Sequence, residues 1–380
     1  MDVDVVLAAN ARPGDGGQGL NLLQMVRGLE GTFRVQVRCA EEWNGRAQRI
    51  PRLGALDRLF ALRGIRRLAD WHAYLTDAYF DRQVASQLPR CRLFQGSTGQ
   101  SLRSLQRARR LGAATLLDVV TVHVDDGNPR VQQASAAEGF TARVHHGHVS
   151  RQRREYAAAD RIRVMSNHAR QTFLERGFSP DQVFALNPFI ELDGFPQARF
   201  REPVFRVCFV GRLVIGKGFH HLIRAYQSAG LPESELVLWG GTGERPVHQL
   251  LLRLLAGSRG IVQRPVPIRS VGLDEVYGKA SVFVHPSLAD GFGLSVAEAM
   301  ASGLPVIVTR TTGAADWVRD GVNGFLVEPG DVDGLCDRLR WCHQNADRLP
   351  EMGRAARETA AEYTFERFRR TYLEEVKRLT

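Results

Sequence analysis

Two basic side chains in a glycine-containing loop are candidates for chemistry in this sequence. Arg212 and Lys217 lie five residues apart within Gly211–Gly218, after a strand-like run. Arginine presents a planar fork of N–H donors and lysine a compact positive charge, so together they can neutralise a diphosphate leaving group. The loop therefore predicts binding of a phosphorylated ligand, and two exposed basic residues on a solvated loop are the alternative.

A second candidate is a pair of acids in the segment Pro286–Pro305. Asp290 and Glu298 stand eight residues apart, and a helix is predicted to begin between them, near Ser295. A carboxylate accepts two hydroxyl hydrogen bonds at once, which suits the diol of a ribose or a hexose. Ser295 and Glu298 also fit a capping box, in which the glutamate binds only the serine backbone. This segment alone favours the cap, but its combination with the basic loop favours a ligand site.

Glycines flank the predicted start of that helix. Gly291 and Gly293 stand on either side of Phe292, and Leu294 follows. Free N–H groups at a helix start favour anions, so we expect a phosphate to dock over Gly293 and Leu294. The basic loop and this helix start both follow predicted strands, and ligands of doubly wound sheets gather at the carboxyl ends of strands.

The first half of the chain carries a glycine motif of its own. Gly14–Gly19 matches G-x-G-x-x-G after the strand-like run Val3–Ala9, and Glu41 and Glu42 follow about 20 residues later. This pattern is typical of dinucleotide binding, so an NAD(P)-dependent oxidoreductase is the rival interpretation. Residues 10–13 weaken it, because the dinucleotide turn follows its strand directly. A long glycine loop suits close approach to a bulkier group, and a flexible turn without a ligand is a third interpretation.

Strand-like and helical patterns alternate along the chain and would position these loops. Such alternation implies parallel sheets with helices on both faces, so we predict an α/β fold of two doubly wound, Rossmann-like domains. The predicted strands are Val3–Ala9, Glu235–Trp239, Ser281–His285 and Pro305–Thr309, with another beginning near Arg206, and the predicted helices are Leu20–Leu29, Phe219–Ala229, Val296–Ala301, Val332–Cys342 and Phe365–Leu379.

The length of 380 residues fits two domains that each bury a core. Pro, Gly and charged residues concentrate at Asn187–Pro203, which marks the boundary. We place the N-terminal domain at residues 1–190, the second at 191–355, and a final helical segment at 356–380.

Composition excludes several classes of protein. No apolar run reaches the roughly 18 residues that cross a bilayer, and the N-terminus lacks a signal-peptide pattern, so we expect a cytoplasmic protein. The five cysteines form no CxxC pair, and His145, His146 and His148 lack matching carboxylates. We therefore expect neither disulfides nor a metal site, and interpret the histidines as a polar surface segment. The net charge of +10 suits an anionic partner, but no nucleic-acid module accompanies the run Arg151–Arg154.

A basic amphipathic pattern spans Arg52–Leu68, where leucines and an isoleucine recur every third residue with arginines between them. A helix of this kind can lie on an anionic membrane surface. An ordinary helix that faces the core and solvates its arginines is the alternative.

Taken together, several segments resemble retaining glycosyltransferases of the GT-B fold, family 4. The resemblance is specific over Val207–Asp331 and looser in the first half, at Gly16-Gly17, Thr121–His123 and Glu155–Gly177. Tyr363–Tyr372 resembles the family's closing helix, which crosses back onto the first domain. The segments that carry the specific part are GRLVIGKG, VLWGGTGE, SVFVHPS, DGFGLSVAEAMASGLPVIVT and GVNGFLVEPGD.

The resemblance implies two Rossmann-like domains with a cleft between them, the second holding a nucleotide-sugar donor and the first an acceptor. It implies transfer of a hexosyl group from a UDP- or GDP-linked sugar to a hydroxyl of a glycan, lipid-linked or small-molecule acceptor. The family retains the anomeric configuration and needs no metal or other cofactor. We therefore expect a metal-independent hexosyltransferase without a nucleic-acid partner, which would be peripheral on the inner face of the cell membrane if Arg52–Leu68 binds lipid.

The resemblance also implies roles for single residues. Arg212 and Lys217 match the diphosphate-binding pair. Glu298 matches the acid that holds the ribose, and Asp290 the acid near the donor-sugar hydroxyls, although glutamate is usual there. His123 aligns with a histidine whose neighbourhood faces the reacting sugar. The predicted catalytic residues are Arg212, Lys217, Asp290 and His123, and the predicted donor-binding residues are Gly16, Gly17, Gly211, Arg212, Lys217, Gly241, Gly291, Phe292, Gly293, Leu294 and Glu298.

Overall fold

The computed structural model describes residues 3–41, 43, 47–50, 69–141, 145–200, 203–243, 245–265 and 271–380. The predicted amphipathic helix at Arg52–Leu68 lies outside these residues, so its membrane role stays a prediction. None of the helices in the described ranges is long and apolar enough to span a membrane.

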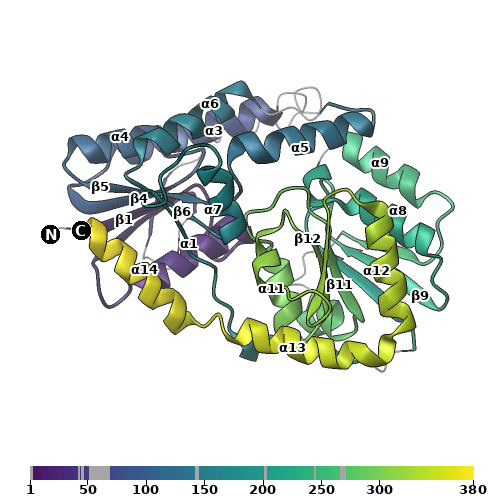
Figure 1. Ribbon diagram of the computed structural model, residues 1–380. Helices are drawn as coiled ribbons and strands as arrows, with labels where there is room; N and C mark the ends of the chain where they lie inside the picture. Colours follow the sequence, from purple (N-terminus) through teal and green to yellow (C-terminus); the bar gives the residue numbers. More distant parts are fainter. Residues whose placement is uncertain are drawn as a thin grey trace.

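The described residues form two parallel sheets flanked by helices, one in each half of the chain (Figure 1). The first sheet has seven strands in the order β3 (Ala47–Arg49), β2 (Val35–Cys39), β1 (Val3–Ala9), β4 (Cys91–Ser97), β5 (Ala114–Val119), β6 (Arg161–Val164) and β7 (Val183–Ala185). The second has six, in the order β10 (Ile261–Arg264), β9 (Ser234–Trp239), β8 (Phe205–Val210), β11 (Val282–His285), β12 (Val306–Thr309) and β13 (Gly324–Val327).

The helices cover both faces of each sheet, as parallel strands require. Those of the first half are α1 (Gly16–Leu29), α3 (Ala69–Ser86), α4 (Leu102–Arg110), α5 (Val124–Ala137), α6 (His146–Ala158) and α7 (Asn167–Leu174). Those of the second half are α8 (Phe219–Ala229), α9 (Arg245–Leu255), α11 (Leu294–Ala301), α12 (Val332–Gln344), α13 (Leu349–Ala361) and α14 (Phe365–Leu379). Single turns form η2 (Leu192–Gly194), η3 (Ile215–Lys217), η4 (Asp274–Gly278), η5 (Gly313–Trp317) and η6 (Ala346–Arg348).

Side chains that point alternately to the two faces of the central strand β8 build the core of the second domain. Val207 and Phe209 pack in one cluster with residues of α8 and α12, whereas Cys208 and Val210 pack in another with residues of α11 and α13. Successive strand side chains point to opposite faces, so a continuous apolar run is needed where both faces are covered. This requirement explains why the strand runs are apolar throughout.

Most predicted elements lie within two residues of their observed bounds, but α1 begins at Gly16 and not at Leu20. Gly16, Gly17 and Gly19 therefore lie in its first turns rather than in a loop before it. The apolar spacing that predicts a helix starts only at Leu20, because glycine has no side chain to contribute to the pattern.

The end of the chain returns to the first domain, as Figure 1 shows for α14 beside α1. Tyr372 of α14 packs so closely on Gly28 that a Cβ there would lie 2.7 Å from its ring, and its hydroxyl donates to Gln95 of β4. The crossing lies between Ala361 and Phe365, so residues 356–361 still belong to α13, which packs on α11 of the second domain.

Candidate functional site

The order of the second sheet reverses between β8 and β11, and ligands of open α/β sheets bind outside the strand ends at such a point. The chain after β8 carries the predicted basic loop, and the chain after β11 carries the predicted acid and helix start. The fold therefore brings together Lys217 and Asp290, which are far apart in sequence.

Lys217 and Asp290 form an ion pair at this point of reversal. Lys217 Nζ donates to Asp290 Oδ2, and His285 Nε2 lies 2.9 Å from the same oxygen. The other oxygen, Oδ1, lies 3.4 Å from the backbone nitrogen of Phe292. Burial alone would raise the pKa of Asp290, but the charge of Lys217 and the hydrogen bond with His285 outweigh it and hold that pKa below its usual range. The carboxylate is therefore ionised and oriented.

His285 is the partner that sequence reasoning missed. It ends β11 and is buried between the rings of Phe209 and Phe283, which are nearly parallel to its own. Burial lowers its pKa, so the ring is neutral and donates its Nε2 proton to Asp290. The position of His285 at the end of a predicted strand, directly before Pro286, could have indicated a site residue, because strand ends face the ligand in this class of sheet.

The start of α11 lies beside this ion pair. Gly293 caps the helix with φ 89°, a left-handed conformation that favours glycine, and a Cβ there would lie 3.4 Å from His285 Nε2. Because the first N–H groups of a helix have no partner within it, those beyond Gly293 suit an anion. The helix begins at Leu294 with Gly293 as N-cap, so Ser295 does not occupy the cap position of the alternative capping box.

Glu298 lies further along α11 and accepts a hydrogen bond of 2.6 Å from the buried hydroxyl of Tyr277. Burial, with the adjacent carboxylate, raises the pKa of Tyr277 well above its usual range, so the tyrosine remains a donor. Sequence reasoning missed Tyr277, because nothing near η4 marks it. The Tyr277 bond fixes one oxygen of Glu298 in place.

The loops after β8 and β9 form the other side of the site. Leu213 N donates to Gly241 O at 3.0 Å, and Gly211 N to Trp239 O at 3.0 Å, so the two loops are bonded together. The Arg212 side chain is exposed and forms no hydrogen bond or ion pair with another described residue. Its guanidinium is therefore available to a ligand.

The predicted glycines place the second domain against the first. A Cβ on Gly17 would lie 4.0 Å from Leu294 Cδ1, which sets the first turn of α1 opposite the start of α11. Gly291 lies so close to Val120 that a Cβ on Gly291 would overlap the carbonyl oxygen of Val120. The carbonyl oxygen of Gly291 accepts a hydrogen bond from Ser166 Oγ at 2.7 Å. Gly291 is thus a point of contact between the domains.

The Phe292 side chain faces the core. It is buried against Trp317, with ring centroids 5.0 Å apart, so only the Phe292 backbone is left to meet a ligand.

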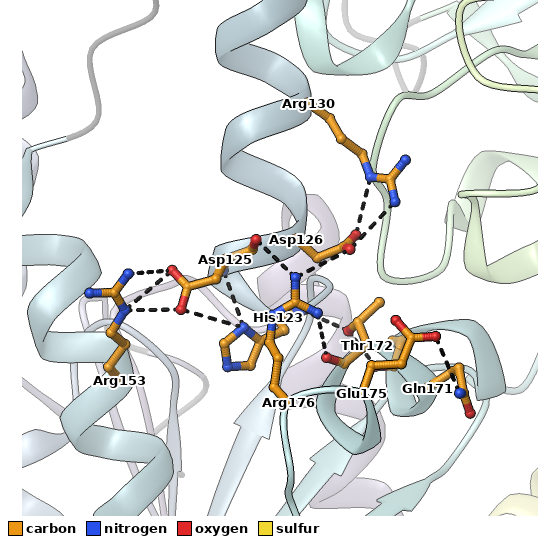
Figure 2. A network of polar contacts seen from close by, with 10 residues as sticks. His123, Asp125, Asp126, Arg130, Arg153, Gln171, Thr172, Glu175 and Arg176 are labelled. Atoms are coloured by element: carbon orange, nitrogen blue, oxygen red, sulfur yellow. Dashed lines mark hydrogen bonds and ion pairs between the residues drawn. The ribbon is translucent and has the colours of Figure 1, made fainter.

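His123 lies in the interior of the first domain (Figure 2). It is the N-cap of α5, and its Nδ1 accepts from Asp125 N at 3.2 Å. Its ring packs on Tyr156 and Phe173. Burial, helped by the charge of Arg176, lowers its pKa to about 4. These contacts give His123 a structural role as a helix cap, and its predicted catalytic role stays a prediction.

The second domain is similar to proteins of a known family. Residues 194–359 match the family model Glycosyl transferases group 1. The D-inositol 3-phosphate glycosyltransferase of Xylanimonas cellulosilytica is 32% identical over 266 residues, which cover 64% of this chain and 61% of that protein. The sulfoquinovosyl transferase SQD2 of Arabidopsis thaliana is 32% identical over 160 residues, which cover 41% of this chain and 30% of that protein. The matches therefore span less than two thirds of these relatives.

Solved structures match over almost the whole chain. The sucrose-phosphate synthase of Thermosynechococcus elongatus has a TM-score of 0.75 at 19% identity, with 99% of both chains covered. Anabaena Alr3699/HepE in complex with UDP-glucose has a TM-score of 0.73 at 16% identity, also with 99% of both chains covered. At sequence identities this low, structural similarity shows that the folds are alike and nothing more. The chain therefore has the GT-B fold, and its residues 194–359 are similar to the glycosyl transferases of group 1.

Proposed function

We propose that the chain is a retaining glycosyltransferase that moves a hexosyl group from a nucleoside diphosphate sugar to an acceptor hydroxyl. The observation that carries the proposal is the meeting of Lys217, Asp290 and the start of α11 where the second sheet reverses. A UDP-linked hexose is the donor we favour, because a neighbour of the same fold is described with UDP-glucose.

In this proposal Lys217 exchanges partners when the donor binds. Its ammonium leaves Asp290 for the diphosphate, joined there by Arg212 and the N-terminus of α11. These charges stabilise the diphosphate most as its negative charge grows, which lowers the barrier specifically in the transition state. They supply what a metal ion would bring, so the proposal includes metal independence. Asp290, still held by His285, then accepts a hydroxyl of the hexose, and Glu298 holds the ribose.

The proposed transfer takes place on one face of the sugar. The bond between the anomeric carbon and the diphosphate oxygen breaks, and a bond to the acceptor oxygen forms on the same side. The acceptor proton passes to the departing diphosphate oxygen. The anomeric configuration is retained without an enzyme nucleophile, so Asp290 only orients the sugar.

Thermal unfolding with UDP, GDP or NADH, each in EDTA, tests the donor site. A ligand that binds only the folded state stabilises it, by about 2.7 kcal/mol at 100 times its Kd. We expect Tm to rise with UDP and to stay unchanged with NADH. A rise with GDP instead would change the base, and a rise with NADH alone would replace the proposal with the dinucleotide interpretation of Gly14–Gly19.

A further inference from the structure

The first sheet has its own point of reversal, between β1 and β4. The segments after β1 and β5 both reach the donor site, since Gly17 approaches Leu294 and Val120 touches Gly291. Because β4 lies parallel between β1 and β5, its carboxyl end lies at the same edge of the sheet as theirs. A ligand bound where β1 and β4 end would therefore lie opposite the donor site.

Three polar side chains meet at this point. Asn10 directly follows β1, and its Nδ2 donates to Asp77 Oδ1 of α3 at 2.8 Å. Its backbone N–H donates to Gln100, which is buried in the loop after β4. Asp77 Oδ2 forms no hydrogen bond with any residue that the structure describes, which leaves it available to a hydroxyl. Burial raises the pKa of Asp77 despite the bond from Asn10, as expected for a carboxylate with too few partners.

Helix α6 holds the loop that carries Gln100. Glu155 accepts hydrogen bonds from Gly99 N at 2.5 Å and Ser101 N at 2.7 Å. Arg151 Nη1 donates to Gly99 O at 3.0 Å. Because both anchors are buried, the loop is ordered before a ligand arrives, which lowers the entropy that binding costs.

Aromatic rings lie beside these polar groups. Trp71, Tyr74 and Asp77 recur every three residues on α3, so each neighbours the next on the helix surface. The Tyr74 ring stacks on His145 at 4.5 Å, and Trp71 meets the same ring at 4.0 Å while remaining 49% exposed. His148 also packs on Tyr74, and burial lowers its pKa to about 4. His145 and His148 are thus partly buried against aromatic rings, whereas His146 is exposed.

We propose that Asn10, Asp77, Gln100 and the exposed Trp71 bind the acceptor, and that the acceptor is an uncharged carbohydrate. The inference rests on the proposed function, because only a glycosyltransferase needs an acceptor here. Carboxylate and amide groups bond to sugar hydroxyls, and aromatic rings pack against the apolar face of a pyranose.

The charges at this point oppose a phosphorylated acceptor. The Asp77 carboxylate would repel a phosphate. Arg151, the cation whose charge acts on Asp77, is buried and already engaged by Gly99 O and by the face of Tyr74, 4.4 Å from its guanidinium carbon. It has little capacity left to neutralise a phosphomonoester.

Initial rates with three donors test the inference: UDP-glucose, UDP-N-acetylglucosamine and GDP-mannose. The acceptor probes are methyl α-D-glucopyranoside, methyl α-D-mannopyranoside and inositol 3-phosphate, and release of nucleotide without any acceptor reports the donor half alone. We expect transfer to a methyl glycoside. Asp77→Asn and Trp71→Ala should each raise its KM at least tenfold. Asp4→Asn is the matched control, because Asp4 pairs with Arg34 near the opposite end of β1.

Two results would overturn the inference while the proposed function stands. One is transfer to inositol 3-phosphate in preference to both glycosides. The other is an unchanged glycoside KM in both variants. Absence of nucleotide release and of transfer with every donor would instead overturn the proposed function, and the inference with it.

Discussion

A lysine held by a buried aspartate is the central feature at the scale of single residues. Lys217 neutralises the buried Asp290, and His285 lies within hydrogen-bond distance of the same carboxylate oxygen. The buried carboxylate therefore has a counter-ion and a second hydrogen-bond partner. This pairing matters because a buried ion without a partner is strongly destabilising.

The proposed exchange predicts that Lys217→Ala lowers kcat about 10²- to 10³-fold, because the growing diphosphate charge loses a fixed cation. The variant should also unfold at lower temperature, since Asp290 loses its counter-ion. Lys279→Ala is the matched control, because Lys279 pairs with Glu275 one turn away. Steady-state rates and Tm of both variants decide the matter. Transfer by Lys217→Ala at the rate of the control would contradict the diphosphate role.

At the scale of elements, helix α5 begins at a histidine cap. The His123 imidazole accepts from Asp125 N only while it is neutral, and burial lowers its pKa to about 4. Between pH 6.5 and 4 the unfolded chain binds a proton there that the folded chain does not. Stability from this residue is therefore complete above pH 6.5 and lost as pH falls towards 4.

We expect His123→Asn to reduce the loss of unfolding free energy between pH 7 and 4.5 by on the order of 2 kcal/mol, because asparagine caps helices without titrating. His123→Ala should reduce this pH-dependent loss equally. Because alanine cannot cap the helix, the variant should also have about 1 kcal/mol less unfolding free energy at every pH. Urea denaturation across this range measures both. The transfer rate at pH 7.5 tests the predicted catalytic role. If His123→Asn folds and transfers sugar at a near-normal rate, His123 acts only as the helix cap.

At the scale of the whole molecule, two domains are held together around the site by few polar contacts. Arg224 of α8 binds Glu138, which ends α5, with Nη2 2.8 Å from Oε2 and a second bond beside it. Asn167 N donates to Asp316 of the second domain at 2.7 Å. Both contacts join the first domain to the second.

Glu138→Gln should weaken this contact between the domains. A partly exposed ion pair contributes about 0.5 to 1 kcal/mol, so we expect the Kd for UDP to rise two- to fivefold with little change in kcat. Small-angle scattering should give a larger radius of gyration without ligand. Glu328→Gln is the control, because its pair with Arg310 lies within the second domain. Equal Kd values in the two variants would show that the interdomain pair does not support closure.

Local patterns in the sequence determined the elements and the class of site. Apolar runs and helical spacing predicted β1, α8 and α14 at their observed bounds, because periodicity is a property of the chain itself. Glycine, basic and acidic residues at short spacing indicated a phosphate site after the strands. The start of α1 at Gly16 was not predicted, because its glycines contribute nothing to the apolar periodicity.

Only the tertiary structure decided which side chains meet. Lys217 and Asp290 are 73 residues apart, and Asn10 and Asp77 are 67 apart. Such pairs depend on the order of strands in a sheet, which brings the ends of distant strands together and which no local pattern encodes. Burial was equally decisive, because it enclosed His123 and His285 in aromatic surroundings. The sequence determined which groups can do chemistry, and the strand order and packing decided which of them face one another.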